Sequence, residues 1–458
     1  MKPQHTKSRA LAWAMTLCMV LMLVTVMTLP VVAADQTGTF NLTAETGTGT
    51  GWDWNPSTLL LTVNNGANIE ITGTAAVGAR VAVAADAKAA VTLRDVSVTE
   101  LLDSSPGTNQ PAILLNSGAE LTLSLSGNNT VSGGSYAAGI QVTGATLIIE
   151  GPGSLNAEGT SGSAAIGGSF NISGVGFSGG TIIINGGTVT ADGSTSGAGI
   201  GGGGANGGGG GGIITINGGT VIARSNGSTT SGAGIGGGAG TSTLSGVGGA
   251  GGTIKITGGT VEATGRFNGA GIGGGGGGNN TGIAGNGGTI TIEGGTVTAI
   301  GNGSGAGIGG GGAGGVNGGG SGNIFISGGT VTASTTGTGT SAAIGRGNNS
   351  TAAGTVAING TYGYTTNTVN SNEPSETLRT GTEIFIGAAV TDIPLTAGRA
   401  ISSFKYINLA PLLFDIKNIP PVCRYAGVKR IQSNQNIVSG RVSAYKGTYF
   451  PVNLAAYG

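Results

Sequence analysis

Charged side chains are the first requirement for acid–base catalysis, and they are scarce in the centre of this chain. Between Ser163 and Gly347 the charged residues are Asp192, Arg224, Lys255, Glu262, Arg266, Glu293 and Arg346. Enzymes that cut acidic polysaccharides use clustered carboxylates, often with calcium, and a basic side chain. Glu262 and Glu293 fall at different positions of the repeats described below, so the sequence indicates no acid–base pair. We expect no catalytic residues and no enzymatic activity, with a polysaccharide lyase or hydrolase as the alternative.

Four carboxylates nearer the N-terminus lie close together in the sequence: Asp86, Asp95, Glu100 and Asp103. Their oxygens could form a calcium site, because calcium takes several oxygen ligands. Solvation of loops and capping of turns is the simpler interpretation. The Gly-rich loops lack Asp, so the calcium-binding nonapeptide pattern is absent. We expect no cofactor, with calcium as the alternative.

Two tryptophans, Trp52 and Trp54, alternate with Asp53 just before the apolar run at residues 59–63. A repetitive fold must cover its terminal edge, so the pair predicts an N-terminal cap over the open end of a core. The functional alternative is an aromatic platform that binds sugar rings.

These residues must be positioned by a repeated segment, GGTIIINGGTVTADGSTSGAGIGGG, Gly179 to Gly203. Copies follow at residues 211–238, 251–275 and 287–311, with a looser one at 321–347. The valine of GGTV recurs after 32, 40, 36 and 34 residues, at Val189, Val221, Val261, Val297 and Val331. A constant core with loops of variable length is typical of a solenoid.

Each copy contains three short strands when it is read with a period of two residues. In the first strand Ile182 and Ile184 share a face, and the residue between the matching isoleucines of a later copy is Lys255. An unpaired charge would not be buried, so the isoleucines point inward. Three inward-facing strands per repeat predict one coil of a parallel β-helix, and we expect about nine or ten coils between about residues 58 and 360.

Less regular coils are expected before the clear repeats, with the same inward strand positions. These positions are Ile69, Ile71, Val81, Val83, Val91, Leu93, Ile113, Leu121, Leu123, Val131, Ile140, Ile148 and Leu155.

Threonines in T-x-T pairs are predicted to face outward from the second strand. They are Thr188, Thr190, Thr296, Thr298, Thr330 and Thr332. Stacked coils would arrange them as a flat array of hydroxyls and methyls, which makes them candidate ligand-binding residues. Such an array resembles the ice-binding face of some solenoids, although Thr is also a good outward strand residue. Ile222 and Glu262 interrupt the array.

The chain has 458 residues, of which 100 are Gly and 8% are charged, and this composition without a Gly-X-Y register favours a solenoid over collagen. Gly-rich loops at 201–212, 240–252, 275–288 and 311–322 leave from the third strand and emerge on one side. Because Gly loses the most backbone entropy on ordering, either the loops are mobile or they pack as extended backbone against each other. Nothing in the composition is basic enough to indicate a nucleic-acid partner.

The N-terminus reads as a secretory signal peptide over residues 1–34, with basic residues, an apolar segment and a small-residue cleavage site. Its removal would take away His5, the only histidine, and leave Cys423 as the only thiol. We expect an N-terminal cap at 35–57, a parallel β-helix at 58–365 and a separate small C-terminal region at 366–458. A signal peptide also predicts no membrane insertion after cleavage.

The GGTVTA and GAGIGGG repeats behind the opening GWDWNPSTLLLTVNNGANIEITG resemble a group of bacterial secreted, Gly-rich surface proteins. These are described as carbohydrate-binding-domain-containing or adhesin-like, and the resemblance covers about residues 37–365. It implies a right-handed parallel β-helix that is secreted or displayed on the cell surface. It also implies a non-catalytic role in binding polysaccharide or cell-surface glycans, with calcium in some members. The few carboxylates of this chain depart from the calcium-binding members.

Overall fold

The computed structural model of the chain describes residues 36–101, 110–241, 246–278, 282–315, 317–337, 339–352, 354–358, 361–367, 383–386, 394–395, 399–400, 404–411, 440–444 and 448–452. The predicted signal peptide and Cys423 lie outside these residues. Within the part that is described, no helix has the length and apolar character needed to cross a membrane.

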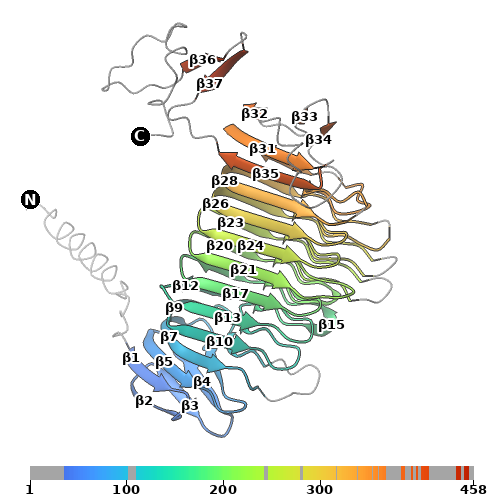
Figure 1. Cartoon of the computed structure of the whole chain (residues 1–458). Coiled ribbons are helices and arrows are strands. Elements are labelled where there is room, and N and C mark those ends of the chain that lie inside the picture. The colour runs from blue at the N-terminus through green and yellow to red at the C-terminus, as the bar shows by residue number, and fades with distance from the viewer. Residues whose placement is uncertain are drawn as a thin grey trace, which may run out of the picture.

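The chain folds as a parallel β-helix, in which strands from successive repeats stack into three faces (Figure 1). The first face contains β1 (Gln36–Asn41), β5 (Ala67–Thr74), β7 (Lys88–Val98), β9 (Glu120–Ser126), β12 (Thr146–Glu150), β16 (Thr181–Ile184), β20 (Ile213–Ile216), β23 (Thr253–Ile256), the first halves of β26 (Thr289–Gly301) and β28 (Asn323–Thr335), and β30 (Thr355–Ile358).

The second face contains β10 (Asn128–Ser132), β13 (Ser154–Glu158), β17 (Thr188–Gly193), β21 (Thr220–Ser225), β24 (Thr260–Gly265) and the second halves of β26 and β28. The third face contains β4 (Leu60–Val63), β6 (Arg80–Val83), β8 (Ile113–Leu115), β11 (Ile140–Gln141), β14 (Ile166–Gly167), β18 (Ile200–Gly201), β22 (Ile235–Gly236), β25 (Ile272–Gly273), β27 (Ile308–Gly309) and β29 (Ile344–Gly345).

The remaining strands lie at the ends or in loops. They are β2 (Thr46–Gly49), β3 (Trp52–Asn55), β15 (Asn171–Val175), β19 (Ala205–Gly207), β31 (Thr361–Asn367), β32 (Glu383–Ile386), β33 (Pro394–Leu395), β34 (Arg399–Ala400), β35 (Tyr406–Pro411), β36 (Gly440–Ala444) and β37 (Thr448–Val452).

The core consists of columns in which one apolar residue per coil stacks on its equivalent in the next. Ile182, Ile214, Ile254, Ile290 and Ile324 form such a column and pair in parallel register. Each of them has an exposed fraction of 0%. On the third face, ten strands from β4 to β29 stack in the described residues, and each pairs in parallel with the next. The predicted fold and coil number are confirmed.

The prediction that Ile148 points inward is wrong. Strand β12 has apolar residues at consecutive positions, so the alternation in the sequence was ambiguous there. Leu147 pairs with Ile182, and Ile149 pairs with Ile184. This register buries Leu147 and Ile149 and turns Ile148, which is half-buried, to the outer surface.

The Gly-rich loops after the third face are packed against each other on one side of the stack (Figure 1). The amide of Gly238 donates to the carbonyl of Gly209 in the preceding loop at 2.9 Å, and Gly249 donates to Gly238 at 2.8 Å. Gly275 in the next loop donates to Gly249 at 2.9 Å. The outgoing and returning arms of each loop are therefore bonded to each other and to the neighbouring loop. Of the two outcomes left open by the sequence, the structure shows packed glycine backbone.

Part of the predicted C-terminal region returns to the β-helix as strand β35. This strand pairs antiparallel with the second half of β28, with Leu409 opposite Val331. Phe404, Ile407 and Leu409 are buried in the common core. Strand β31 pairs with the other edge of β35. The second half of β28 is the last parallel strand of the second face, so its outer edge would otherwise be unpaired. Residues 404–411 cover that edge.

Lys405 anchors this covering strand by a buried ammonium group. Its Nζ donates to the carbonyl oxygens of Gly339 and Ser341, both at 2.6 Å, and to Ser341 Oγ at 3.3 Å. We expect Lys405→Met to leave these acceptors without their donor and to destabilise the covering strand by about 1–3 kcal/mol. Hydrogen exchange at residues 331–334 should become faster, whereas Lys88→Met, which alters an exposed pair with Glu120, should leave it unchanged.

The same lysine predicts a pH dependence. Burial lowers the pKa of Lys405 below its ordinary value of 10.5, so the docked strand binds the proton less tightly than the undocked strand. The contribution of Lys405 to stability should therefore rise as the pH increases from the lowered pKa toward 10.5, and it should not change with pH below that window, where the lysine is protonated in both states. The melting temperature of the wild type should therefore rise relative to that of Lys405→Met as the pH increases through this window. A difference in melting temperature that does not change with pH would contradict the lowered pKa of Lys405.

Candidate functional site

The predicted outward threonines lie on the outer surface of the second face. Thr188 pairs with Thr220, Thr220 with Thr260, Thr260 with Thr296, and Thr296 with Thr330. They form one uninterrupted row across five coils, here called the threonine row. Thr220 and Thr260 were missing from the sequence-based candidates. The GGTV motif could have identified them, because it places a threonine at this position in every clear repeat.

The parallel row, two residues further along each strand, is mixed. It runs through Thr190, Ile222, Glu262, Thr298 and Thr332 in pairing order. The interruption expected at Ile222 and Glu262 therefore separates Thr190 from Thr298 and Thr332, which are neighbours. At the end of the row, Asn408 of β35 donates from Nδ2 to Thr332 Oγ1 at 3.1 Å.

A charged cluster lies in the middle of the second face and was not predicted. Arg224 Nη2 contacts Glu262 Oε1 at 3.2 Å, and Arg224 Nη1 lies 3.9 Å from Asp192 Oδ1. Glu158 pairs with Asp192 on the preceding coil. All of these side chains are partly exposed. A guanidinium group stays protonated, so Arg224 compensates the carboxylates but cannot serve as a proton acceptor.

Amide side chains continue the polar surface at the corner between the first and second faces. Asn217 Nδ2 donates to Asn185 Oδ1 at 2.9 Å, and Thr257 Oγ1 donates to Asn217 Oδ1 at 2.8 Å. These residues follow the first strand in three successive coils. The ladder holds its amides in fixed orientations and presents their remaining hydrogen-bonding groups to solvent.

The three candidate calcium ligands that lie in the described residues are not brought together. Asp86 and Asp95 have positive φ values of 55° and 52°, which places them at corners of the chain. Asp95 Oδ1 accepts a hydrogen bond from the Asn128 amide at 2.9 Å, so this carboxylate caps a turn. Glu100 is exposed, and Asp103 lies outside the described residues. Over the described ranges, no group of three or more potential metal-binding side chains was found, so Asp86, Asp95 and Glu100 do not form the predicted cluster.

The tryptophans lie at the N-terminal end of the stack. Strand β3 pairs antiparallel with β4, with Trp52 opposite Val63 and Trp54 opposite Leu61. Both rings contact Phe40, at centroid distances of 4.9 Å and 5.3 Å. Both are partly buried against the core, which is the arrangement of a cap.

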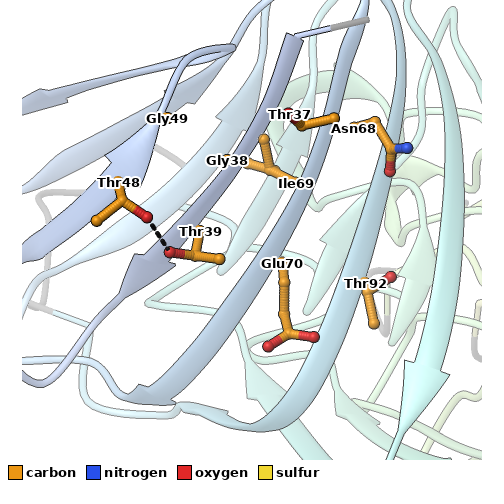
Figure 2. A pocket seen from close by; sticks show the side chains of 9 residues that line it. All are labelled: Thr37, Gly38, Thr39, Thr48, Gly49, Asn68, Ile69, Glu70 and Thr92. Carbon is orange, nitrogen blue, oxygen red and sulfur yellow. Dashed lines mark hydrogen bonds between the residues drawn. The ribbon is translucent and has the colours of Figure 1, made fainter.

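A hollow lined by both polar and apolar groups lies nearby on the outer surface of the first face (Figure 2). It has a volume of about 440 Å³ and is lined by residues of β1, β2, β5 and β7. We call it the N-terminal groove. Thr39 and Thr48 hydroxyls lie 3.0 Å apart across its rim. Sequence reasoning missed the groove, because its polar residues are typical outward strand residues and are distributed over three coils.

A family model described as Beta helix repeat matches residues 147–170, 182–204, 214–239, 254–276 and 290–312. Each match begins at the first buried residue of a first-face strand and ends just after the third-face strand, so it covers one coil. The repeats are thus similar to that family, in agreement with the parallel β-helix. No curated protein and no solved structure matches the chain.

Proposed function

We propose that this chain is a non-catalytic, secreted or cell-surface binding protein of a bacterium, and that it binds polysaccharide along its second face. The threonine row carries the proposal. Its hydroxyls repeat once per coil, at the strand spacing of about 4.8 Å. This interval is comparable with the length of one sugar residue in an extended polysaccharide, so a chain lying along the helix axis meets one hydroxyl per residue.

The surrounding chemistry supports a neutral or weakly charged ligand. Arg224 contacts both Asp192 and Glu262, and Glu158 pairs with Asp192, so the cluster keeps a small excess of negative charge that disfavours an acidic ligand. Binding would rest on many hydrogen bonds from hydroxyls and amides, each of modest strength. Repetition along the coils gives such a surface avidity for a polymer that a short fragment would lack. The predicted signal peptide supports an extracellular location, and the low basic content does not support nucleic acid as a partner.

The test is a triple variant, Thr220→Val, Thr260→Val and Thr296→Val, which removes three hydroxyls and preserves shape and strand preference. We expect at least tenfold weaker retention of the variant on the insoluble polysaccharide that binds the wild type best. The matched control, Thr215→Val with Thr291→Val, makes the same change on the outer surface of the first face and should bind as the wild type does. Equal retention of the triple variant would contradict the proposal.

A polysaccharide lyase or hydrolase remains the second candidate, because two carboxylates lie beside Arg224 on one face. If the wild type released reducing sugar from a polysaccharide, and Asp192→Asn or Glu262→Gln abolished that release, the binding-only proposal would be wrong. Ice binding, the third candidate, requires thermal hysteresis that Thr298→Tyr removes.

A further inference from the structure

We propose that the N-terminal groove is a second carbohydrate site, separate from the second face, which takes a short neutral oligosaccharide. The ligand class rests on the proposed function, whereas the site rests on the geometry of the groove. Its polar lining consists of Thr37, Thr39, Thr48, Asn68, Glu70 and Thr92. A hollow of about 440 Å³ is within the usual range for small-ligand sites.

Four of these side chains form one row across the strands. Thr48 pairs with Thr39, Thr39 with Glu70, and Glu70 with Thr92. Neighbouring members are about 4.8 Å apart, as strands in a sheet are. The row is therefore matched to successive residues of a sugar chain in the same way as the threonine row. Unlike that row, it is hollowed and contains a carboxylate.

Glu70 is held in position before any ligand arrives. Arg94 Nη2 contacts Glu70 Oε2 at 2.6 Å, and this contact restricts the orientation of a carboxylate that lines the groove. A fixed carboxylate accepts hydrogen bonds from two neighbouring sugar hydroxyls, and such charge-assisted bonds are stronger than neutral ones. The pair of Thr39 and Thr48 hydroxyls, 3.0 Å apart, retains lone pairs for the ligand.

The donor and acceptor set selects the ligand class. Asn68 supplies both an amide donor and an amide acceptor, and the threonines can either donate or accept. The groove lining contains no cationic side chain, and the adjacent Arg94 is already paired with Glu70, so nothing in the lining favours a phosphate or an acidic sugar. Calcium would need more oxygen ligands of this kind than a single carboxylate that is already paired with arginine. A neutral polyhydroxy compound is the class that satisfies all of these groups.

The test is isothermal titration of the full chain with neutral tetrasaccharides of β-1,4-linked glucose, mannose and N-acetylglucosamine. We expect one of them to bind, and Glu70→Gln to weaken it at least tenfold. The matched control is Glu120→Gln, which changes a carboxylate on the same face that is paired with Lys88 at 3.0 Å and lies outside the groove. Thr92→Ala, which leaves the Arg94 pair intact, should also weaken binding.

Two outcomes overturn the groove site: no tetrasaccharide binds to the wild type, or Glu70→Gln and Thr92→Ala both bind as tightly as Glu120→Gln. Retention on polysaccharide by the threonine row is measured separately, with the triple valine variant. If the groove does not bind tetrasaccharide, the measured retention on polysaccharide still supports the threonine row. If the triple variant is retained like the wild type, a measured tetrasaccharide affinity still supports the groove.

Discussion

Replacing Ile214 by alanine should destabilise the β-helix by about 2–5 kcal/mol, the usual cost of truncating a fully buried isoleucine. Ile214 has an exposed fraction of 0% and lies between Ile182 and Ile254 in one column. Each coil depends on its neighbours to bury its apolar residues. A cavity at this position therefore weakens the contacts on both sides.

The neighbouring residue provides the control for this prediction. Ile213 is in the same strand, β20, and has an exposed fraction of 52%. Ile213→Ala should change stability by about 0.5 kcal/mol or less, as most surface substitutions do. Urea unfolding followed by circular dichroism measures both variants. Equal losses would show that the inward register of the first face is misassigned.

The second large effect is expected in the Gly-rich loops, from Gly209→Ala. A Cβ added at Gly209 would lie closer than 3.0 Å to the carbonyl oxygen of Phe177, which belongs to the backbone and cannot rotate away. The amide of Gly209 also donates to Gly203 at 2.8 Å, so a shift of this arm disturbs the loop layer. We expect a loss of about 1–3 kcal/mol, the usual cost of overpacking, and faster hydrogen exchange across residues 201–212.

Gly210→Ala is the matched control within the same loop. The nearest atom to a Cβ at Gly210 is the Ala250 carbonyl oxygen, at 3.9 Å, which is an ordinary contact. Neither Gly209 nor Gly210 has a positive φ, so the φ angle excludes alanine at neither position and the two variants differ in the space around the added Cβ. Gly210→Ala should be neutral or stabilise by about 0.4–1 kcal/mol, because alanine restricts the unfolded chain. Were both variants equally stable, the loops would not be packed as the structure shows.

The position of the core was predictable because it depends on a local pattern. Alternation in the first strand, with Lys255 at an outward position, was enough to place Ile182 and its equivalents inside. The pattern failed where it was ambiguous, at Ile148, since apolar residues occupy both faces of β12. Pairing with β16 decided that case.

The candidate sites were less predictable, because they join residues from different coils. Loops of unequal length separate Asp192, Arg224 and Glu262, so their contact depends on the register between coils and not on spacing along the chain. The N-terminal groove combines β1 and β2 with two later coils. Strand β35 reaches β28 from more than seventy residues away, and no repeat pattern marks its partner.

The sequence by itself determined the class of fold, the inward columns and the outward threonines, because the two-residue period and the recurring motif are both present within each repeat. Only the tertiary structure decided whether the glycine loops are ordered, which charges meet and what covers the last coil. Those outcomes depend on hydrogen bonds and contacts between segments that the chain brings together only when its coils stack.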